Sequence, residues 1–296
     1  MNKLFAIVAH QPSHALYWTV EYLSAFPENT IIIHYDAKSD ISEIADLAKE
    51  NVILLTKRVP VYWGDVSQIH ATCRLLEEAM RYRFDYFFLL SGDDVPAASN
   101  EAINAFLSKH RGQEFIHYQD ERSHYVNPAD RVMYKYPPYF FTKQKSLVFA
   151  VKRKLFKHIR FMYKNHEITS LLSNGLEMTF YKGTNWFALT YGSIGFILDI
   201  LHTHPTLLPS FNFTYCSDEI FFHTLLKMKP EVKIYDNPGV RNNCFRYIDW
   251  NSGPDYPRTL DVSDVEKIRK NFYFFTRKVS DKLTQEEFSH FKDLVN

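Results

Sequence analysis

Cysteine is scarce in this sequence, and its scarcity argues against two structural classes. The 296 residues contain only three cysteines, Cys73, Cys216 and Cys244, which are odd in number and far apart. A disulfide framework uses cysteines in pairs, and a thiolate zinc site needs several of them close together, so we expect neither. The pattern fits a protein from a reducing compartment.

Long apolar runs and an excess of charge of one sign are also missing. No stretch approaches the roughly 20 apolar residues of a membrane-spanning helix, so we expect a protein that is soluble or lies on a membrane surface. The formal net charge is only +1, whereas most nucleic-acid-binding proteins have a strong basic excess. We therefore expect no nucleic-acid partner, and any electrostatic function must be local.

Several catalytic motifs are absent as well. The sequence has no Gly-x-Ser-x-Gly, P-loop or Gly-x-Gly-x-x-Gly motif, and its thirteen histidines include no His-Glu-x-x-His spacing. These absences weaken esterase, ATPase and dehydrogenase interpretations, and they weaken a metal site built from histidines. Hydrophobic residues, in contrast, make up 46% of the chain and aromatic residues 16%, which is enough for a sizeable core and for rings in a binding cleft.

Strand-like and helix-like segments alternate in the first half of the chain. Buried-strand patterns lie at 4–9, 30–34, 52–55 and 86–90, and apolar residues recur at helical spacing in 16–26, 41–50 and 67–82. Such alternation predicts βαβ units, and hence an α/β fold with a mostly parallel central sheet flanked by helices.

The regular pattern is interrupted after residue 117 and returns from residue 183. Later elements are predicted as a strand at 186–190, helices at 194–202 and 220–228, and a strand at 232–235. Because no repeat and no linker rich in glycine or serine divides the chain, we predict a single domain over 1–296 with an elaborated middle region.

Polar residues follow the predicted parallel strands. His10, Asp36 and Lys38 follow the first two strands, and Asp93 and Asp94 follow a later one. Ligands of open α/β sheets bind beyond the carboxyl ends of the strands, so these residues are candidates for a nucleotide pocket. A turn-forming aspartate at a strand end explains Asp36 equally well.

The adjacent acids Asp93 and Asp94 lie where many sugar-nucleotide enzymes bind a divalent cation. Neighbouring side chains in extended chain point in different directions, however, so the two carboxylates are poorly placed to chelate one ion. We favour a role for one of them in anchoring the loop or contacting a sugar. A metal site is the alternative.

An acidic pair begins the stretch from Tyr215 to Lys278. Asp218 and Glu219 precede an apolar helical run, which Ser217 or Asp218 would cap. A carboxylate that points into an aromatic cleft has a raised proton affinity and is a competent general base. An acid that merely complements the helix dipole is the alternative.

A basic pair ends the same stretch. Arg277 and Lys278 follow the aromatic run 272–276, and a guanidinium beside an ammonium suits diphosphate oxygens. An ordinary surface pair explains them as well, and Arg258 is a similar, weaker candidate. His223 lies four residues after Glu219 and could orient it, although we favour a core histidine.

The segment 143–164 is strongly basic. It contains eight Lys or Arg residues and no acid, interleaved with apolar residues. This pattern is typical of an interfacial helix on an anionic membrane. The alternative, which we favour, is an amphipathic helix that packs its apolar side on the core.

Eight short motifs, in order along nearly the whole chain, carry a family resemblance. They are Ala9-His10, Ile33–Ser39, Val61–Ser67, Leu90–Pro96, Gly183–Phe187, Ser217–Leu225, Tyr247–Trp250 and Phe275–Lys278. With these motifs the sequence resembles the core 2/I-branching glycosyltransferases, an inverting family that includes branching β-1,6-N-acetylglucosaminyltransferases and peptide O-xylosyltransferases. The residues from about 122 to 181 match least.

The resemblance implies a GT-A-like fold, a UDP-sugar donor carrying N-acetylglucosamine or xylose, and a glycan acceptor. It also implies metal-independent catalysis, with no cofactor. Three parts of the chain are then expected: a nucleotide-binding half (1–120), a basic aromatic insertion (121–182), and an acceptor and catalytic half (183–296).

Roles for individual residues also follow from the resemblance. Glu219 resembles the family's catalytic base. The nucleotide and its diphosphate would be held by His10, Asp36, Lys38, Arg258, Arg277 and Lys278. The acceptor or the sugar would contact Asp94, Asn185 and Trp186. Xylosyltransferases have an aspartate at the position of Asn185, so the resemblance leaves the identity of the acceptor open.

Cellular context is a further expectation. Animal family members carry a membrane anchor and many disulfides, which we do not find in this sequence, so the resemblance implies a bacterial, cytoplasmic version. It would act in surface-polysaccharide synthesis, on an acceptor that could be lipid-linked, with 143–164 touching the inner face of the membrane. Two competing interpretations are a metal-dependent glycosyltransferase using Asp93 and Asp94, and a non-catalytic carbohydrate-binding protein.

Overall fold

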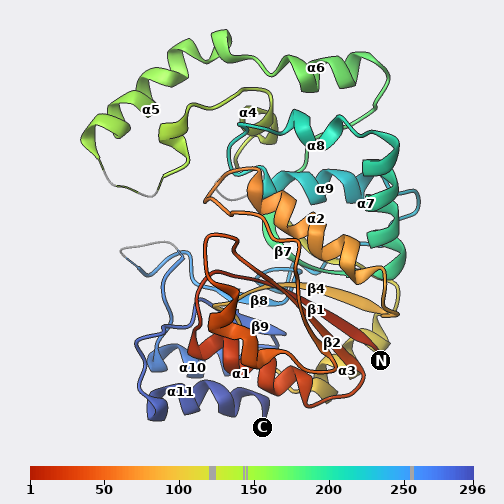
Figure 1. Cartoon of the computed structure of the whole chain (residues 1–296), viewed down its shortest axis with the longest axis vertical. Coiled ribbons are helices and arrows are strands. Elements are labelled where there is room, and N and C mark those ends of the chain that lie inside the picture. The colour runs from red at the N-terminus through yellow and green to blue at the C-terminus, as the bar shows by residue number, and fades with distance from the viewer. Residues whose placement is uncertain (120–124, 143, 145, 254–256) are drawn as a thin grey trace.

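A six-stranded sheet forms the centre of the protein (Figure 1), which we describe from a computed structural model of residues 1–119, 125–142, 144, 146–253 and 257–296. Its strands, in the order β3-β2-β1-β4-β7-β6, are β1 (Lys3–Ala9), β2 (Asn29–Tyr35), β3 (Val52–Leu54), β4 (Tyr86–Ser91), β6 (Phe115–Tyr118) and β7 (Gly183–Thr190). β1 to β4 are parallel, and β7 runs antiparallel to its neighbours β4 and β6. The mostly parallel sheet predicted from the sequence is confirmed.

Helices cover both faces of this sheet, which explains why its strands are almost continuously apolar. Side chains of β1 alternate between the faces, so that Leu4 and Ala6 join one hydrophobic core while Phe5 and Ile7 join the other. The first core is completed by α2 (Ser67–Ala79), α7 (Tyr191–Thr203) and α9 (Asp218–Met228), and the second by α1 (His14–Ser24) and α3 (Asn100–Lys109).

A second sheet lies next to the first and was not predicted. Its three short strands, in the order β5-β9-β8, are β5 (Val95–Pro96), β9 (Phe275–Arg277) and β8 (Arg246–Ile248). Phe275 of β9 packs on Phe5 and Phe88 of the central sheet, with ring centroids 5.9 and 6.0 Å away. The sheet is covered by η4 (Val262–Asp264), α10 (Val265–Arg269), α11 (Gln285–Lys292) and η5 (Asp293–Val295).

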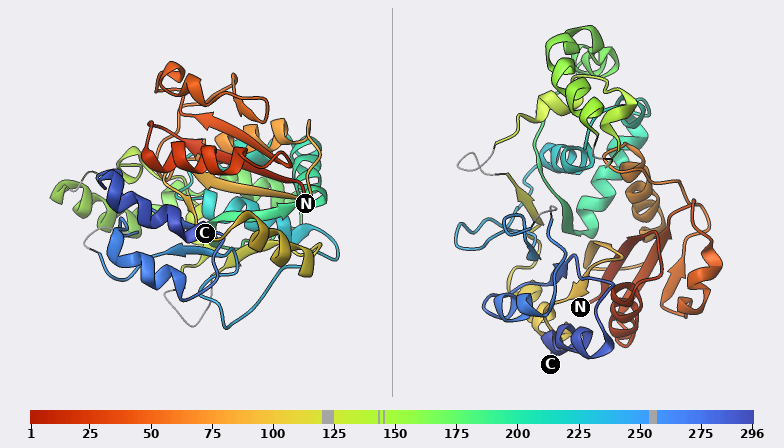
Figure 2. Two further views of the ribbon diagram at one scale, coloured as in Figure 1. Left: turned by 90° about the horizontal axis from the view of Figure 1, so that it is seen from below. Right: turned by 90° about the vertical axis from the view of Figure 1, so that its left-hand side faces the viewer.

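The middle of the chain forms the end of the molecule opposite α11 (Figures 1 and 2). It contains α4 (Pro128–Val132), η2 (Pro138–Phe140), α5 (Leu147–Ile159), η3 (Arg160–Tyr163) and α6 (His166–Ser173), beside α8 (Leu207–Ser210). Tyr136, Phe140 and Phe156 make a small aromatic core of their own there. In the described ranges, no helix has the length and apolar character needed to cross a membrane.

Two of the predicted elements differ from the structure. The segment predicted as a helix at 41–50 forms only the 3₁₀ helix η1 (Ile41–Leu47). The prediction of a strand at 232–235 is wrong. The segment makes one isolated bridge, between Glu114 and Ile234, because its backbone forms hydrogen bonds only with Glu114 among the described residues. The elements otherwise build the single α/β domain with an elaborated middle that the sequence predicts.

Candidate active site

A cleft with a volume of about 2410 Å³ opens at the carboxyl ends of the parallel strands. His10 after β1 and Ser91 at the end of β4 line it. Because β7 is antiparallel, its first residues, Gly183 to Trp186, face the same edge, as does the start of α9. Pockets for a single small ligand usually measure about 300–1,000 Å³, so this cleft has room for two substrates.

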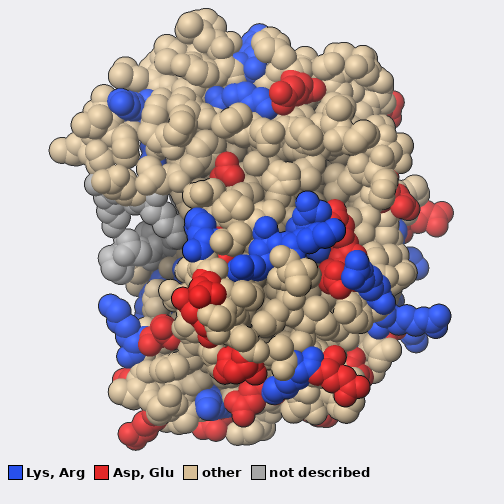
Figure 3. Space-filling model, in the orientation of Figure 1, with Lys and Arg blue, Asp and Glu red and all other residues tan. Residues whose placement is uncertain are grey.

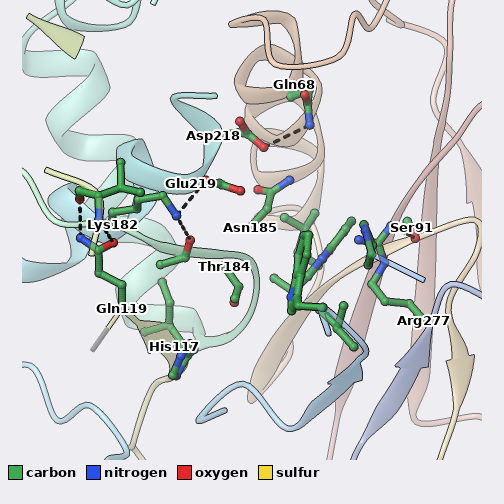
Figure 4. Close-up of a pocket in the computed structure, with 18 of the residues that line it drawn as sticks. Gln68, Ser91, His117, Gln119, Lys182, Thr184, Asn185, Asp218, Glu219 and Arg277 are labelled. Atoms are coloured by element: carbon green, nitrogen blue, oxygen red, sulfur yellow. Dashed lines mark hydrogen bonds and ion pairs between the residues drawn. The ribbon is translucent and has the colours of Figure 1, made fainter. Parts of the chain in front are cut away.

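Glu219 lines this cleft from the first turn of α9. Its side chain is 29% exposed, and its Oε2 lies 2.9 Å from Nζ of Lys182, the residue just before β7. Figure 4 shows this ion pair on one side of the cleft, with the amide of Asn185 beside Glu219. Lys182 therefore holds the carboxylate at the cleft wall while leaving part of it open to a ligand.

Asp218 lies beside Glu219 and also lines the cleft, but its side chain is much less exposed. It is buried, its Oδ2 accepts a hydrogen bond from Nε2 of Gln68 at 3.1 Å, and its Oδ1 has no partner among the described residues. Burial, with the nearby charge of Glu219 adding to it, raises the pKa of Asp218 to about 7. The raised pKa of Asp218 thus follows from its burial beside a second acid.

The predicted caps of α9 are wrong. Ser217 occupies the N-cap position, but its Oγ has no hydrogen-bond partner within the described ranges, and Asp218 turns to Gln68 instead. The N-cap backbone is already helical (φ −78°, ψ −12°) rather than extended, so the Ser217 side chain does not project over the first amides. The acidic pair is placed by packing and by Gln68.

His223 is a core histidine, as we favoured. Its Nε2 donates to the backbone oxygen of His117 at 3.1 Å, and burial lowers its pKa to about 3, so the ring is neutral. Gly183 allows this close packing, because a Cβ there would lie 1.7 Å from that oxygen and 2.4 Å from Nε2 of His223. This requirement for glycine explains the first residue of the Gly183–Phe187 motif.

Arg277 lines the cleft at the end of β9, on the far side of Asn185 from Glu219 (Figure 4). Its Nε lies 3.0 Å from Oδ1 of Asp94, its Nη2 donates to Oγ of Ser91 at 3.3 Å, and its guanidinium lies 4.3 Å from the ring centroid of Trp186. A planar guanidinium held on an aromatic face is well suited to bind phosphate oxygens.

Asp94 is fully buried and joins two basic side chains. Besides Arg277 it pairs with Arg246 of β8, whose guanidinium also lies 5.1 Å from the Trp186 ring. One carboxylate between two guanidinium groups leaves a net positive charge at this place. Asp94 therefore anchors the β4–β5 loop to β8 and β9. It was predicted as a sugar contact, but it is not one of the described residues that line the cleft.

Lys278 supplies a second cation to the cleft. Its Nζ is 3.3 Å from Oδ2 of Asp93, and its side chain is 33% exposed. Asp93 and Asp94, in the turn between β4 and β5, thus face different basic residues. In the described part of the chain, no three His, Cys, Asp or Glu side chains gather as metal ligands; catalysis without a metal stays a prediction.

The two acceptor-side candidates, Asn185 and Trp186, both line the cleft. Trp186 is 8% exposed and lies under Arg277, so its ring forms part of the floor. Oδ1 of Asn185 is buried and has no partner among the described residues. An unpaired buried acceptor costs free energy, and a hydroxyl donor in the cleft would satisfy it.

Of the strand-end candidates, His10 lines the cleft and is exposed. Asp36 and Lys38, both within the described ranges, do not line it. Oδ1 of Asp36 accepts the backbone N–H groups of Lys38 at 2.9 Å and Val61 at 3.3 Å, and these bonds lower its pKa against the opposing effect of burial. Asp36 thus fixes the segment that carries Val61 into the cleft wall; its contact with a nucleotide stays a prediction.

Arg258 bonds within its own loop. Its guanidinium donates to Asp264 at 2.8 Å and to Asp261 at 2.7 Å, and it does not line the cleft among the described residues, although Pro257 and Thr259 do. Its position therefore fits an anchor of the loop before α10. The predicted contact with the diphosphate has no support from this geometry and is untested.

Sequence reasoning missed three residues that arrange the site: Gln68, Lys182 and Arg246. Each adjoins a quoted motif, since Gln68 follows Val61–Ser67, Lys182 precedes Gly183–Phe187 and Arg246 precedes Tyr247–Trp250. Their partners, Asp218, Glu219 and Asp94, are more than 30 residues away in the chain. Proximity to a motif was therefore the only signal that could have found them.

The sequence of this chain matches the model of a known protein family. The family model described as Core-2/I-Branching enzyme matches residues 5–272, which include Glu219 and most of the cleft. The chain belongs to the Core-2/I-branching enzyme family. The GT-A-like fold expected from the resemblance is confirmed with it.

Curated relatives from animals are similar to this chain over most of its length. Xylosyltransferase 2 of Rattus norvegicus is 24% identical over 282 residues, covering 88% of this chain and 30% of the rat protein. Xylosyltransferase 2 of Homo sapiens is 24% identical over 277 residues (86% and 29%), and Xylosyltransferase oxt of Drosophila melanogaster is 22% identical over 287 residues (88% and 29%). The chain thus spans less than a third of these relatives. A bacterial origin stays a prediction.

Proposed function

We propose that this protein is an inverting glycosyltransferase that moves a sugar from a UDP-sugar to a hydroxyl group of a glycan. One observation carries the proposal: Glu219 and the basic pair Arg277 and Lys278, which lies far from it in the sequence, line one cleft. Family membership and the printed activity of the xylosyltransferase relatives support the same reaction class.

Charge on the leaving group is the first problem of this reaction. When the bond between sugar and phosphate breaks, negative charge grows on the diphosphate, and cations fixed beforehand stabilise it without reorganising. Arg277 is held by Asp94, Ser91 and Trp186 and so meets that requirement. Lys278 adds a partly exposed point charge, so the two residues do what a metal ion does in other sugar-nucleotide enzymes.

Removal of the acceptor proton is the second problem. We assign it to Glu219, whose partly exposed carboxylate, paired with Lys182, can accept a proton. A general base at this step typically contributes about 10²–10⁴ in rate. Attack by the hydroxyl on the sugar face opposite the departing UDP then inverts the anomeric centre. Asn185, whose Oδ1 lies next to Glu219 and has no hydrogen-bond partner in the described part of the chain, would accept a hydrogen bond from a neighbouring hydroxyl of the acceptor and so hold the acceptor in place.

The donor sugar and the cellular setting are narrower proposals. Xylose is supported by the names of the relatives, and N-acetylglucosamine by the branching enzymes that the sequence resembles. We propose a surface glycan, free or lipid-linked, as the acceptor, a reaction that needs no metal, and a bacterial, cytoplasmic setting.

A screen of nucleotide sugars tests this function. The purified protein is heated with UDP-xylose, UDP-N-acetylglucosamine, UDP alone or GDP-mannose, each with and without EDTA, and UDP release is measured in parallel. We expect UDP compounds to raise the melting temperature, and UDP release from one of the UDP-sugars to continue in EDTA. Release that stops in EDTA would favour the metal-dependent mechanism at Asp93 and Asp94. Binding of sugars without any release of UDP would favour a carbohydrate-binding protein.

A further inference from the structure

Helix α5 has two apolar faces, and only the narrower one is packed. Phe156 is 2% exposed, and its ring lies 5.1 Å from both Tyr136 and Phe140. Phe149, seven residues before it and therefore on the same side of the helix, faces Tyr139 at 6.5 Å. These contacts fix the helix on the small aromatic core at one end of the molecule.

The broader apolar face of α5 points to solvent. Leu147, Val151, Leu155 and Ile159, spaced four residues apart, are 88%, 57%, 57% and 41% exposed, and Val148 beside them is 60% exposed. We call these five residues the α5 stripe. Phe161 and Met162 of η3 extend the exposed surface, so that half of the sixteen large exposed hydrophobic side chains in the described ranges lie between Leu147 and Tyr163. Apolar surface gathered in this way marks an interaction site.

Basic residues border the α5 stripe on both sides. At 100° per residue, Lys154 and Lys157 lie along one edge of the stripe and Lys152 along the other, and all three are exposed. Ten of the 35 Lys and Arg residues of the chain, and none of its 34 Asp and Glu residues, lie between Asp130 and Glu167. The rest of the chain therefore has a net negative charge. Figure 3 shows this end of the molecule as mostly uncharged surface, with Lys and Arg in several places and an acidic side chain beside one of them.

The amphipathic helix that we favoured from the sequence, with its apolar side on the core, therefore describes only the smaller face. Lys143 and Lys145 of the predicted basic segment lie outside the described residues. The charges indicate what covers the larger face. A second copy docked through the same stripe would bring lysines against lysines, because symmetric contacts repeat one patch, whereas an anionic lipid surface accepts both the apolar stripe and the lysines.

We propose that α5 docks this protein on the surface of an anionic phospholipid membrane. The α5 stripe enters the boundary between headgroups and acyl chains, and Lys152, Lys154 and Lys157 extend to the phosphates around it. Leu147 and Ala150 of α5 also line the cleft. Docking therefore brings the rim of the cleft to the membrane; if the proposed function holds, the acceptor is reached there.

Vesicle flotation with the full chain tests the docking. Phosphatidylcholine vesicles with and without phosphatidylglycerol are compared for wild type, for the charge variant Lys154→Glu/Lys157→Glu and for the stripe variant Val151→Asp/Leu155→Asp. The control, Lys270→Glu/Lys282→Glu, makes the same charge change at exposed positions near α10 and α11. None of these six residues lines the cleft among the described residues.

We expect wild type and control to float with the anionic vesicles only, and less so as salt is added. Both α5 variants should lose at least about tenfold in partitioning while keeping wild-type melting temperatures and, without vesicles, wild-type UDP release. No binding of wild type, equal losses in the control, or a dimer in sedimentation that the stripe variant abolishes would each overturn the proposal. Flotation needs no substrate, so it stands or fails separately from the transferase assignment.

Discussion

At the scale of single residues, two neighbouring acids both line the cleft but differ in burial, since Asp218 is buried and Glu219 is partly exposed. Asp218 accepts a hydrogen bond from Gln68, while Glu219 forms an ion pair with Lys182. Burying a carboxyl group without a cation favours its protonated form. The stability of the protein should therefore depend on pH through Asp218.

We expect Asp218→Asn to stabilise the protein increasingly as the pH rises from about 4 to about 7. The pKa of Asp218 is about 7 in the folded protein against a usual value of 3.8. Between these values the unfolded chain releases a proton that the folded chain keeps, so the stability of wild type falls as the pH rises and levels off above 7. The amide has no such proton to lose.

Urea unfolding at several pH values measures this effect as the difference in free energy of unfolding between variant and wild type. Glu177→Gln changes an exposed acid and is the control, for which the difference should be small and flat. A difference for Asp218→Asn that is the same at pH 4.5 and pH 8 would contradict the burial argument.

At the scale of elements, β9 places Arg277, and Lys278 directly after it, beside the ends of β1 and β4. It is only three residues long, yet Phe275 packs into the central core and Arg277 pairs with Asp94. Arg246 from β8 pairs with the same carboxylate. Loss of Arg277 would therefore leave Asp94 with a partner and the small sheet in place.

We expect Arg277→Ala to lower kcat/KM by about 10²–10³, the usual effect of removing one group that stabilises transition-state charge, with a folded protein. Arg258→Ala should mainly lower stability, since Arg258 bonds to Asp261 and Asp264 outside the cleft. Arg269→Ala, at an exposed pair with Glu266, is the control. UDP release and thermal unfolding of the three variants separate a loss of catalytic rate from a loss of stability. If Arg258→Ala lost as much rate as Arg277→Ala, Arg258 would belong to the diphosphate site.

The elements that could be predicted from sequence are those whose burial leaves a pattern. β1, β2 and β4 are apolar runs because helices cover both faces of the sheet. The strands β5, β8 and β9 are two or three residues long, too short to show any periodicity. The spacing of α5 is helical, but spacing alone does not tell which of its two apolar faces is packed.

At the scale of the whole molecule, the cleft joins parts that the sequence keeps apart. Glu219 comes from α9 and Arg277 from β9. Asn185 and Trp186 come from the start of β7, which precedes both in the sequence. The candidate residues could be named from motifs, but their supporting partners, Lys182, Gln68 and Arg246, depend on the fold. Asp36 is an opposite case. Its place at the end of a strand matches the pattern of a ligand-binding acid, yet in the structure its hydrogen bonds hold the backbone at Lys38 and Val61.

The same scale explains why a chain of nearly balanced charge can have separate charged regions. Positive charge is concentrated around α5 and around Asp94, where two guanidinium groups meet one carboxylate. Acids elsewhere offset it in the total. The net charge of the sequence therefore excludes only a strongly basic protein. The positions of the charged regions follow from the fold.

The central claim is that Glu219 removes the acceptor proton in the cleft whose cations hold the UDP group. Its most direct test is the transfer rate of Glu219→Gln, with Glu177→Gln as the control and UDP-induced thermal stabilisation as a measure of donor binding. We predict that Glu219→Gln keeps the thermal stabilisation by UDP and loses about 10²–10⁴ in transfer rate, while the control matches wild type. Transfer by Glu219→Gln at the wild-type rate would contradict the account.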